Sequence, residues 1–231
     1  MTPPRPASLT VLGAGPAGYP AAFRAADLGL PVTLIDSAPA LGGTCLHRGC
    51  IPSKALLHAA RLLADAREAA ALGLEFAPPA IRLEKLRDWK QSVTDRLAQG
   101  LAQLAKSRGV RVVEARAAFA APAQLRLTAP DGGGRPMDFD TLLLATGSAP
   151  ALPAAFPAGH PHLWDSTAAL DLAEIPETLL VVGGGYIGLE LGSVYAALGT
   201  RVTVVEMTGG LLPGVDRDLI VPLAKRLRGL F

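Results

Sequence analysis

The chain has little of three features that mark particular classes of protein. Aromatic residues make up only 5% of its 231 residues, cysteine occurs twice, and the charges of the two signs nearly cancel at a formal net charge of +2. This balance argues against a nucleic-acid-binding face built from bulk positive charge, and against a polyacidic tail. Few aromatics together with 25 glycines disfavour an aromatic-rich all-β barrel and favour a buried α/β sheet.

Long uncharged hydrophobic runs are also missing. The most apolar stretch, 179–207, contains Glu190, Arg201, Glu206 and six glycines, so it predicts no membrane span. The first eight residues hold three prolines and an arginine where a signal peptide needs an apolar run. We therefore expect a cytoplasmic protein that uses neither a membrane nor a nucleic acid as partner. A hydrophobic content of 50% suffices for one large or two small cores and excludes disorder as the dominant state.

An internal repeat organises the sequence. Residues 9–36 align without a gap on residues 179–206, each position being shifted by 170. Each copy predicts a strand, a tight turn, a helix and a second strand, with strands buried on both faces. The shared positions are mostly glycines and end in an acid: Gly13/Gly183, Gly15/Gly185, Gly18/Gly188, Gly29/Gly199, Val32/Val202 and Asp36/Glu206.

The segment between the copies changes its pattern of apolar residues and prolines twice. Leucine and alanine at intervals of three and four residues predict two helices, after which alternating apolar residues predict strands and a run of prolines indicates a linker. The expected elements are helices at 52–72 and 81–108, strands at 110–114, 124–128 and 137–145, a glycine turn at 131–134 and a domain linker at 150–161.

The first glycine motif occupies residues 13–18, between a predicted strand and a predicted helix. In this context Gly13 makes the tight turn, Gly15 lets a pyrophosphate approach the backbone, and Gly18 lets helix and strand pack closely. The helix N-terminus adds partial positive charge. Asp36 is placed to accept hydrogen bonds from ribose hydroxyls. The alternative is a glycine-rich turn that holds no ligand.

The second glycine motif, residues 183–188, has the same context and predicts a second dinucleotide site. Glu206 at the strand end would bond a 2′-hydroxyl and repel a 2′-phosphate, which favours NAD over NADP. Two nucleotide sites in one chain imply that electrons pass between the nucleotides.

The two cysteines lie in residues 42–54, which read GGTCLHRGCIPSK. The loop between Cys45 and Cys50 is too short to stabilise a fold by restricting the unfolded chain. Because Pro52 suits the first position of a helix, Cys50 is expected at a helix N-terminus, where partial positive charge favours the thiolate. Cys45 could then bond Cys50, and the pair could exchange with a thiol substrate. A static disulfide and two buried thiols are alternatives, whereas a zinc site with His47 lacks a fourth ligand.

This string closely resembles the redox motif of the dihydrolipoamide dehydrogenases, which are flavin-dependent pyridine nucleotide-disulfide oxidoreductases. The resemblance runs from about Leu9 through Leu212, and residues 144–147 look like the family's second flavin-contacting segment. It implies an α/β fold of two Rossmann-like dinucleotide-binding units, the second incomplete, with a small β-meander in the first. Residues 1–150 would form the FAD-binding domain with the redox disulfide, and 151–231 the N-terminal part of the NAD-binding domain.

The resemblance also implies roles for individual residues. Cys45 would be the interchange thiol that attacks substrate and Cys50 the thiol that contacts the flavin. Lys54 would lie near the flavin and form a buried ion pair with Glu190, since neither charge is stable alone in a core. Tyr186 either covers the nicotinamide pocket or packs on its helix. The positions expected to bind cofactor are Gly13, Gly15, Pro16, Gly18, Asp36, Gly43, Thr44, Lys54, Ala117, Thr146, Gly147, Gly183, Gly185, Tyr186, Ile187, Gly188 and Glu206, and no metal ligand is expected.

The reaction implied is dihydrolipoamide plus NAD to lipoamide plus NADH, through the Cys45–Cys50 disulfide and FAD. Two alternatives stay open: another disulfide reductase of the mercuric or glutathione reductase type, and a non-catalytic truncated FAD-binding fragment. The partner is a dihydrolipoyl group or another dithiol, and relatives form homodimers that join 2-oxo acid dehydrogenase complexes. Relatives are longer and carry a C-terminal interface domain with a catalytic base, so weak or no dimerisation is expected here. His160 lies in the proline linker and is not expected to replace that base.

Overall fold

The structure is a computed structural model that describes residues 7–157 and 159–231, and it divides into two compact units. Unit 1 contains the described residues through Arg48 together with Thr94–Ala149, and unit 2 contains Gly49–Val93 and Pro150–Phe231. The fold is α/β with parallel sheets, as predicted. Each copy of the sequence repeat lies in its own unit. The functional boundary at residue 150 remains a prediction, while the packing of residues 49–93 with the second copy was not foreseen.

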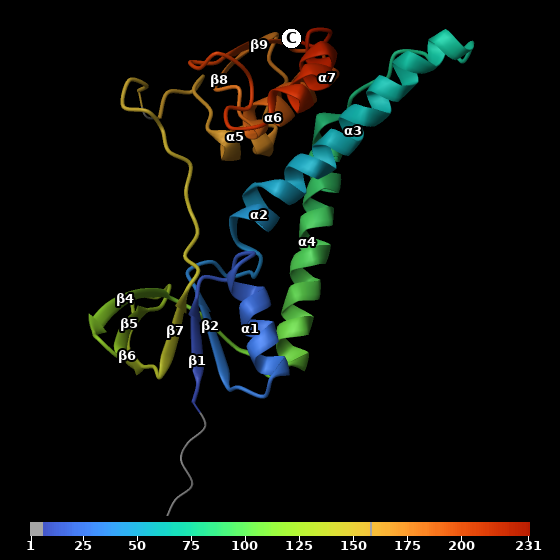
Figure 1. The fold of residues 1–231 in the computed structure, drawn as a ribbon. Helices are drawn as coiled ribbons and strands as arrows, with labels where there is room; N and C mark the ends of the chain where they lie inside the picture. Colours follow the sequence, from blue (N-terminus) through green and yellow to red (C-terminus); the bar gives the residue numbers. More distant parts are fainter. Residues whose placement is uncertain (1–6, 158) are drawn as a thin grey trace, which may run out of the picture. The chain divides into compact units, whose positions relative to one another are not determined.

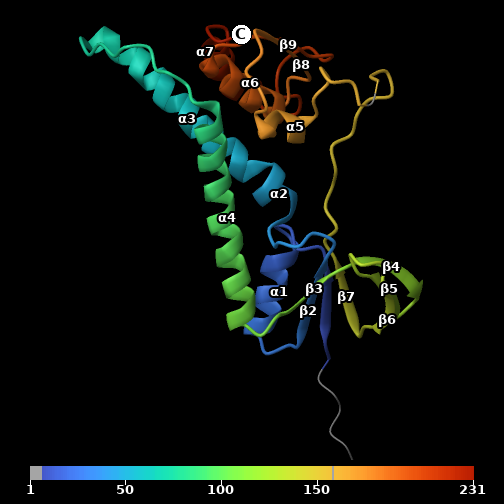
Figure 2. The same cartoon turned by 180° about the vertical axis from the view of Figure 1, so that it is seen from behind.

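Unit 1 is a parallel sheet with helices on one face and a meander on the other (Figure 1). Within the described residues the sheet has the order β3-β2-β1-β7, and β4, β5 and β6 form an antiparallel meander. Figure 2 shows β3 beside β2 from the opposite side. The elements are β1 (Leu9–Leu12), α1 (Gly18–Asp27), β2 (Val32–Asp36), α2 (Gly43–Arg48), the later part of α4 (Leu83–Ser107), β3 (Arg111–Glu114), β4 (Arg116–Ala121), β5 (Gln124–Thr128), β6 (Gly134–Asp138) and β7 (Thr141–Leu144).

The core of unit 1 has two layers because both sheet faces are covered. Val11 and Leu34 are fully buried in the cluster that includes Phe23 of α1. On the other face Ile35 is fully buried against Leu125 and other side chains of the meander. Burial of apolar side chains on both faces explains why the strands of the first copy are continuous apolar runs.

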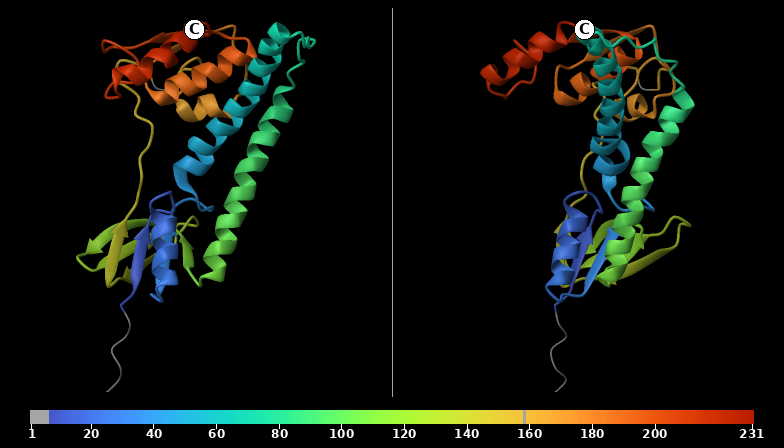
Figure 3. Two further views of the ribbon diagram at one scale, coloured as in Figure 1. Left: turned by 45° about the vertical axis from the view of Figure 1, so that its right-hand side comes forward. Right: turned by 90° about the vertical axis from the view of Figure 1, so that its right-hand side faces the viewer.

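Unit 2 is built around a shorter sheet, in which β8 pairs with β9 in parallel. Figure 3 shows α3, in cyan, beside α6, in orange, in both views. Pro52 and Ser53 lie in the first turn of α3, so the helix begins where the sequence predicts. The elements are α3 (Cys50–Glu68), the short 3-10 helix η1 (Ala69–Leu72), the first part of α4, α5 (Ser166–Asp171), β8 (Thr178–Val182), α6 (Tyr186–Leu198), β9 (Arg201–Val205) and α7 (Arg217–Leu227).

The core of unit 2 lies between helices and one face of its sheet. Tyr195 of α6 is fully buried in a cluster with Leu56 of α3, Leu172 and Val202. The opposite face of the sheet is open, and Leu180 of β8 is 60% exposed. The second copy therefore buries its apolar side chains mainly against helices.

Two sequence predictions about the meander are wrong. The single strand expected at 137–145 is two strands, β6 and β7, which pair in different sheets. The chain turns between them at Phe139 and Asp140, where neither glycine nor proline signals a break. β4 was missed because four of its six residues are alanines, which have a low preference for strands, and its pairing with β5 overrides that preference.

The described part of the chain holds no helix long and apolar enough to span a membrane. The helices expected at 52–72 and 81–108 are confirmed as α3 with η1 and as α4.

Candidate functional site

The first glycine turn follows β1 and tolerates no side chain at two positions. Gly13 has a φ of +104° and donates its amide to the Ile35 carbonyl at 2.7 Å. A Cβ on Gly13 would lie 2.1 Å from the Ala145 carbonyl oxygen, and one on Gly18 would lie 1.7 Å from the Gly13 oxygen. Both contacts are far inside van der Waals distance and involve backbone, so the turn requires glycine.

Asp36 is held against this turn by backbone amides. Its carboxylate accepts hydrogen bonds from the amide of Ala14 at 2.6 Å and from that of Ala38 at 2.8 Å. The loop then returns, and the Gly42 amide donates to the Ala14 carbonyl at 2.9 Å. Asp36 is therefore fixed at the carboxyl end of β2, the edge of a parallel sheet where dinucleotides bind.

Other predicted cofactor positions also gather at the first turn. The Ala145 amide donates to the Leu12 carbonyl at 2.8 Å, which places Thr146 beside Gly13. Gly43 has a φ of +59°, and a Cβ there would lie 2.6 Å from the Gly15 Cα. Five expected positions, Gly13, Gly15, Gly18, Gly43 and Thr146, thus come together in unit 1.

Four further positions differ in their surroundings. Gly147 follows Thr146 with a φ of +73°, and Pro16 and Thr44 are exposed beside the turn. Ala117 instead lies in β4, where it packs against the meander core. In the structure Ala117 therefore has a packing role, and its contact with a cofactor stays a prediction.

The second glycine turn repeats the hydrogen bonds of the first at positions shifted by 170. The Gly183 amide donates to the Val205 carbonyl at 2.8 Å, and the Gly184 amide donates to Glu206 Oε2 at 2.7 Å. The Thr208 amide donates to Glu206 Oε1 at 2.8 Å, and the Leu212 amide donates to the Gly184 carbonyl at 2.9 Å. The structural repeat therefore extends six residues beyond the acid, to Gly42 and Leu212.

These amides also affect the charge of Glu206. Hydrogen bonds from the backbone of Thr208 and then of Gly184 hold the pKa of this carboxyl below its ordinary value. The anionic form is thus stabilised at the end of β9, where the sequence predicts an acceptor for ribose hydroxyls. Gly188 packs closely on the turn, since a Cβ there would lie 2.5 Å from the Gly183 oxygen.

The helices that follow the two turns begin without a side-chain cap. Among the described residues, no side chain caps α1 at Ala17 or α6 at Gly185. By contrast, α5 is capped by Asp165, whose carboxylate accepts from the Ala168 amide at 2.8 Å. A helix N-terminus that no side chain caps offers its amides and partial positive charge to an anion. Both turns therefore fit the pyrophosphate of a dinucleotide.

The two cysteines lie on consecutive helices. Cys45 is half-buried in α2, and Cys50 is the exposed first residue of α3, with Gly49 as N-cap. The Ser53 amide donates to the Gly49 carbonyl at 3.0 Å and so closes the first turn of α3. The position predicted for Cys50 at a helix N-terminus is confirmed, whereas the disulfide with Cys45 remains a prediction.

Lys54 and Glu190 form the ion pair that the sequence predicts, since Lys54 Nζ lies 2.5 Å from Glu190 Oε1. The expectation that the pair is buried is wrong: the Lys54 side chain is 59% exposed. Sequence analysis also missed Ser53, which is buried and whose hydroxyl lies 3.2 Å from Glu190 Oε2 and 3.1 Å from the Cys50 carbonyl oxygen. A small polar residue on the packed face of an amphipathic helix is the signal that could have identified it.

Three further residues, Tyr186, Ile187 and His47, lie outside the hydrophobic cores. Tyr186 is 66% exposed and Ile187 is exposed beside it, so neither packs in the helical core. His47 is tied to the backbone through a 2.8 Å contact between its Nε2 and the Leu41 carbonyl oxygen. No group of three or more metal-binding side chains occurs among the described residues.

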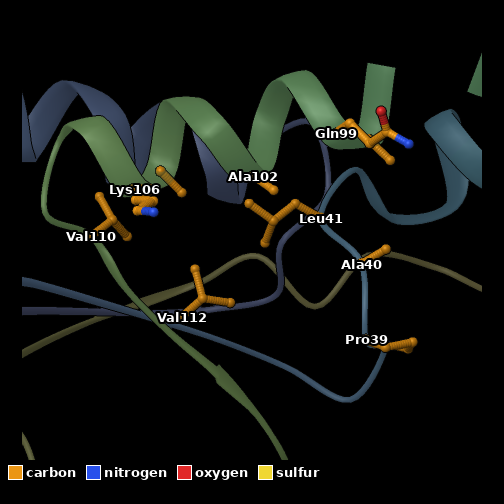
Figure 4. Close-up of a pocket in the computed structure, with 10 residues that line it drawn as sticks. Pro39, Ala40, Leu41, Gln99, Ala102, Lys106, Val110 and Val112 are labelled. Carbon is orange, nitrogen blue, oxygen red and sulfur yellow. The ribbon is translucent and has the colours of Figure 1, made fainter. Parts of the chain in front are cut away.

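An apolar groove of about 500 Å³ lies in unit 1 between α4, β3 and the loop after β2 (Figure 4). Figure 4 shows Leu41 pointing toward Ala102 of α4. Gln99 and Lys106 are the polar residues among those that line the groove, and neither glycine turn nor cysteine lines it. It is therefore separate from the candidate site.

Comparisons with known proteins agree with this geometry. The family described as Pyridine nucleotide-disulphide oxidoreductase matches residues 7–230. The chain belongs to this family. Among curated relatives, dihydrolipoyl dehydrogenase of Haemophilus influenzae is 46% identical over 96% of this chain and 47% of its own length. The enzyme of the same name from Vibrio parahaemolyticus is 44% identical over 97% of this chain and 47% of its own length.

Solved structures of family members resemble the whole chain. LpdA from Mycobacterium tuberculosis has a TM-score of 0.85 at 30% identity and covers 96% of this chain and 50% of its own. The HOCl-induced flavoprotein disulfide reductase RclA from Escherichia coli has a TM-score of 0.80 at 29% identity, over 96% of this chain and 47% of its own. The chain therefore spans about half the length of the relatives it matches.

Proposed function

We propose that this chain is the dinucleotide-binding and redox-active part of a dihydrolipoyl dehydrogenase. The observation that carries the proposal is the pair of glycine turns, each closed by its own acid, in a chain whose cysteine helix also bears the Lys54–Glu190 ion pair. Two dinucleotide sites and a cysteine at a helix N-terminus fit electron transfer between a dithiol and a nucleotide. The relatives named dihydrolipoyl dehydrogenase support this choice of substrate.

FAD fits the first turn and NAD fits the second. Gly13, Gly15 and Asp36, with Thr146 and Gly147 nearby, would hold FAD, and its isoalloxazine would supply two-electron redox chemistry. Gly183, Gly185 and Glu206 would hold NAD. Because Glu206 is held anionic, it accepts from ribose hydroxyls and repels a 2′-phosphate.

The chemistry of the cysteines is thiol–disulfide exchange. A thiolate of the dihydrolipoyl group attacks the Cys45 sulfur, the Cys45–Cys50 bond breaks, and Cys50 leaves as a thiolate that the N-terminus of α3 stabilises. The second substrate thiol gives its proton to solvent and attacks the substrate sulfur of the mixed disulfide, which releases Cys45 as a thiolate. The substrate is oxidised to a disulfide and the cysteine pair is reduced to a dithiol by two electrons.

Lys54 and Glu190 set the charge beside the cysteine helix. Lys54 lies one helical turn after Cys50, so its ammonium favours negative charge near the start of α3. Glu190 and Ser53 fix where that ammonium lies. We propose that the pair orients Lys54 toward the flavin.

The proposal is tested with the purified chain and its Cys45→Ser and Cys50→Ser variants. We expect yellow protein with one FAD per chain, and dihydrolipoamide should produce a long-wavelength thiolate-to-flavin absorption band. Cys50→Ser should lack this band, whereas Cys45→Ser keeps the Cys50 thiolate and should show a band that does not depend on dihydrolipoamide. NADH formation with dihydrolipoamide, measured beside NADH oxidation with glutathione disulfide, identifies the substrate. Loss of all flavin on a desalting column would contradict the proposal.

A disulfide reductase is the second candidate, favoured by the structural likeness to RclA. The parallel assays separate it from the first candidate, because activity with another disulfide and none with dihydrolipoamide would select it. Weak or no dimerisation of this chain, membership of a 2-oxo acid dehydrogenase complex and a cytoplasmic location remain predictions.

A further inference from the structure

The loop after β9, residues 207–216, folds back onto the second glycine turn. The Leu212 amide donates to the Gly184 carbonyl at 2.9 Å. Leu211 packs against the same residue, since a Cβ on Gly184 would lie 2.8 Å from Leu211 Cδ2. Thr208 and Gly184 both donate to Glu206. The loop, the turn and the acid therefore form one connected unit at the predicted ribose site.

One side chain, Arg217 at the start of α7, holds this loop closed. Its Nη1 donates to the Leu211 carbonyl at 3.0 Å, and its Nη2 donates to the Leu212 and Val215 carbonyls at 2.7 Å each. Its Nε donates to the Val215 carbonyl at 3.1 Å. A planar guanidinium spreads its donors over three nitrogens and can reach three carbonyls at once, whereas an ammonium carries its three N–H donors on one nitrogen.

The loop needs such a clamp because its backbone is strained. Leu212 has a φ of +49°, in the left-handed region that a leucine rarely adopts. The corresponding residue of the first copy is Gly42, which has a φ of +119° and makes the equivalent hydrogen bond to Ala14. The first copy thus has a glycine at this positive-φ position, while the second copy holds a leucine there with Arg217.

We propose that Arg217 is a positioning residue for nucleotide binding at the second glycine turn. Its contacts with the carbonyls of residues 211–215 keep the Leu212–Gly184 hydrogen bond and hence the orientation of Glu206. This inference rests on the proposed function, because it takes NAD as the ligand of that turn. Arg217 acts through the loop, because its donors bond backbone carbonyls. Its effect on nucleotide binding therefore depends on the geometry of these hydrogen bonds more than on its positive charge.

The test measures the affinity of the full chain, loaded with FAD, for NADH by titration calorimetry. We expect Arg217→Gln and Arg217→Lys to weaken NADH binding about tenfold or more, because neither side chain can bridge three carbonyls. Hydrogen exchange of the amides of Leu212 and Val215, which bond the Gly184 and Leu212 carbonyls, should increase in both variants. FAD content and melting temperature should stay as in the wild type, since the first copy is untouched. Arg226→Gln, on the same helix, is the matched control and should change neither binding nor exchange.

A rescue variant separates positioning from a purely structural effect. Leu212→Gly removes the backbone strain, so Arg217→Gln with Leu212→Gly should recover most of the lost affinity. Wild-type affinity in Arg217→Lys would show that charge alone is needed and would overturn the inference, as would unchanged exchange in Arg217→Gln. A wild-type protein that binds no NADH would contradict the proposed function, and the exchange measurement would still decide whether Arg217 holds the loop.

Discussion

The two copies of the repeat share a turn and differ in what surrounds it. Each turn has a left-handed first glycine, an amide bond to an acid and a returning loop. In the first copy Ile35 is fully buried under the meander, whereas its counterpart Val205 is 43% exposed. The short sequence unit therefore encodes the glycine turn and its acid, while the packing of that turn comes from other segments.

The helices of the two copies show the same contrast. Ala25 of α1 packs against the sheet, but its counterpart Tyr195 fills a core shared with α3 and α5. The position of Glu190, which binds Lys54 of α3, is Pro20 in the first copy. The helix of the second copy is therefore packed mainly against other helices, whereas the helix of the first copy is packed mainly against its sheet.

The largest difference between the copies is expected at the first glycine of each turn. Gly13→Ala places a Cβ 2.1 Å from the Ala145 oxygen, whereas a Cβ on Gly183 meets no atom of the described residues within 4 Å. We expect Gly183→Ala to cost about 1–2 kcal/mol of unfolding free energy through its positive φ. Gly13→Ala should cost more than about 4 kcal/mol because a backbone clash is added. Urea unfolding and FAD content measure both.

Equal losses in the two glycine variants would contradict the idea that the copies differ in packing. A matched control is Gly29→Ala against Gly199→Ala, where both glycines have positive φ and neither Cβ meets a described atom within 4 Å. These two should cost the same to within about 0.5 kcal/mol.

The second expected effect concerns Tyr195, the large core residue found in the second copy. Burial raises the pKa of Tyr195 to about 12, and its hydroxyl donates to the Ala169 carbonyl at 2.8 Å. The tyrosine ionises near pH 10 in the unfolded state and only near pH 12 in the folded state. The free energy of unfolding therefore falls as the pH rises from 10 to 12. Tyr195→Phe should cost about 1–2 kcal/mol at neutral pH and weaken this alkaline loss.

Denaturant unfolding from pH 7 to 11 compares the wild type with Tyr195→Phe. Tyr19→Phe, in α1 of the first copy, is the matched control for the loss of a tyrosine hydroxyl outside the second copy. A Tyr195→Phe protein that keeps the full wild-type slope would show that Tyr195 is not the residue responsible.

The third effect tests the bond between the second copy and the cysteine helix. Ser53→Ala leaves Glu190 Oε2 without its hydroxyl partner, which should cost about 1 kcal/mol of unfolding free energy. It should also weaken the thiolate-to-flavin band, because Lys54 loses its fixed position. Ser193→Ala is the control, since the Ser193 hydroxyl lies on the same helix as Glu190 but donates to the Leu189 carbonyl. An unchanged band in Ser53→Ala would mean that Lys54 alone positions Glu190.

Local chemistry was predictable from the sequence, and long-range packing was not. The glycine turns, the two acids and the start of α3 at Cys50 depend on residue types at fixed spacings. The Lys54–Glu190 pair joins residues far apart in the sequence, and it was expected only from the family resemblance. The meander strand β4 depends on pairing with β5, which no local preference of its alanines reveals. The clamp by Arg217 could not be predicted from the repeat either. Gly42 and Leu212 make equivalent hydrogen bonds in the two copies, but the residue types differ, so the sequence alignment does not show that the repeat extends to them.

The smallest expected effect concerns the acids that close the two turns. Backbone amides lower the pKa of Glu206 below 4.5, so its carboxylate contributes stability that is present above that pH and is lost as pH falls through the folded-state pKa. Glu206→Gln removes this contribution, and the difference in unfolding free energy from the wild type should therefore shrink below pH 4.5. In ligand binding we expect Glu206→Gln to weaken NADH and keep FAD, and Asp36→Asn to do the reverse. A constant difference at every pH would instead show that ionisation of Glu206 does not contribute to stability, and loss of both nucleotides in either variant would show that the two turns do not bind independently.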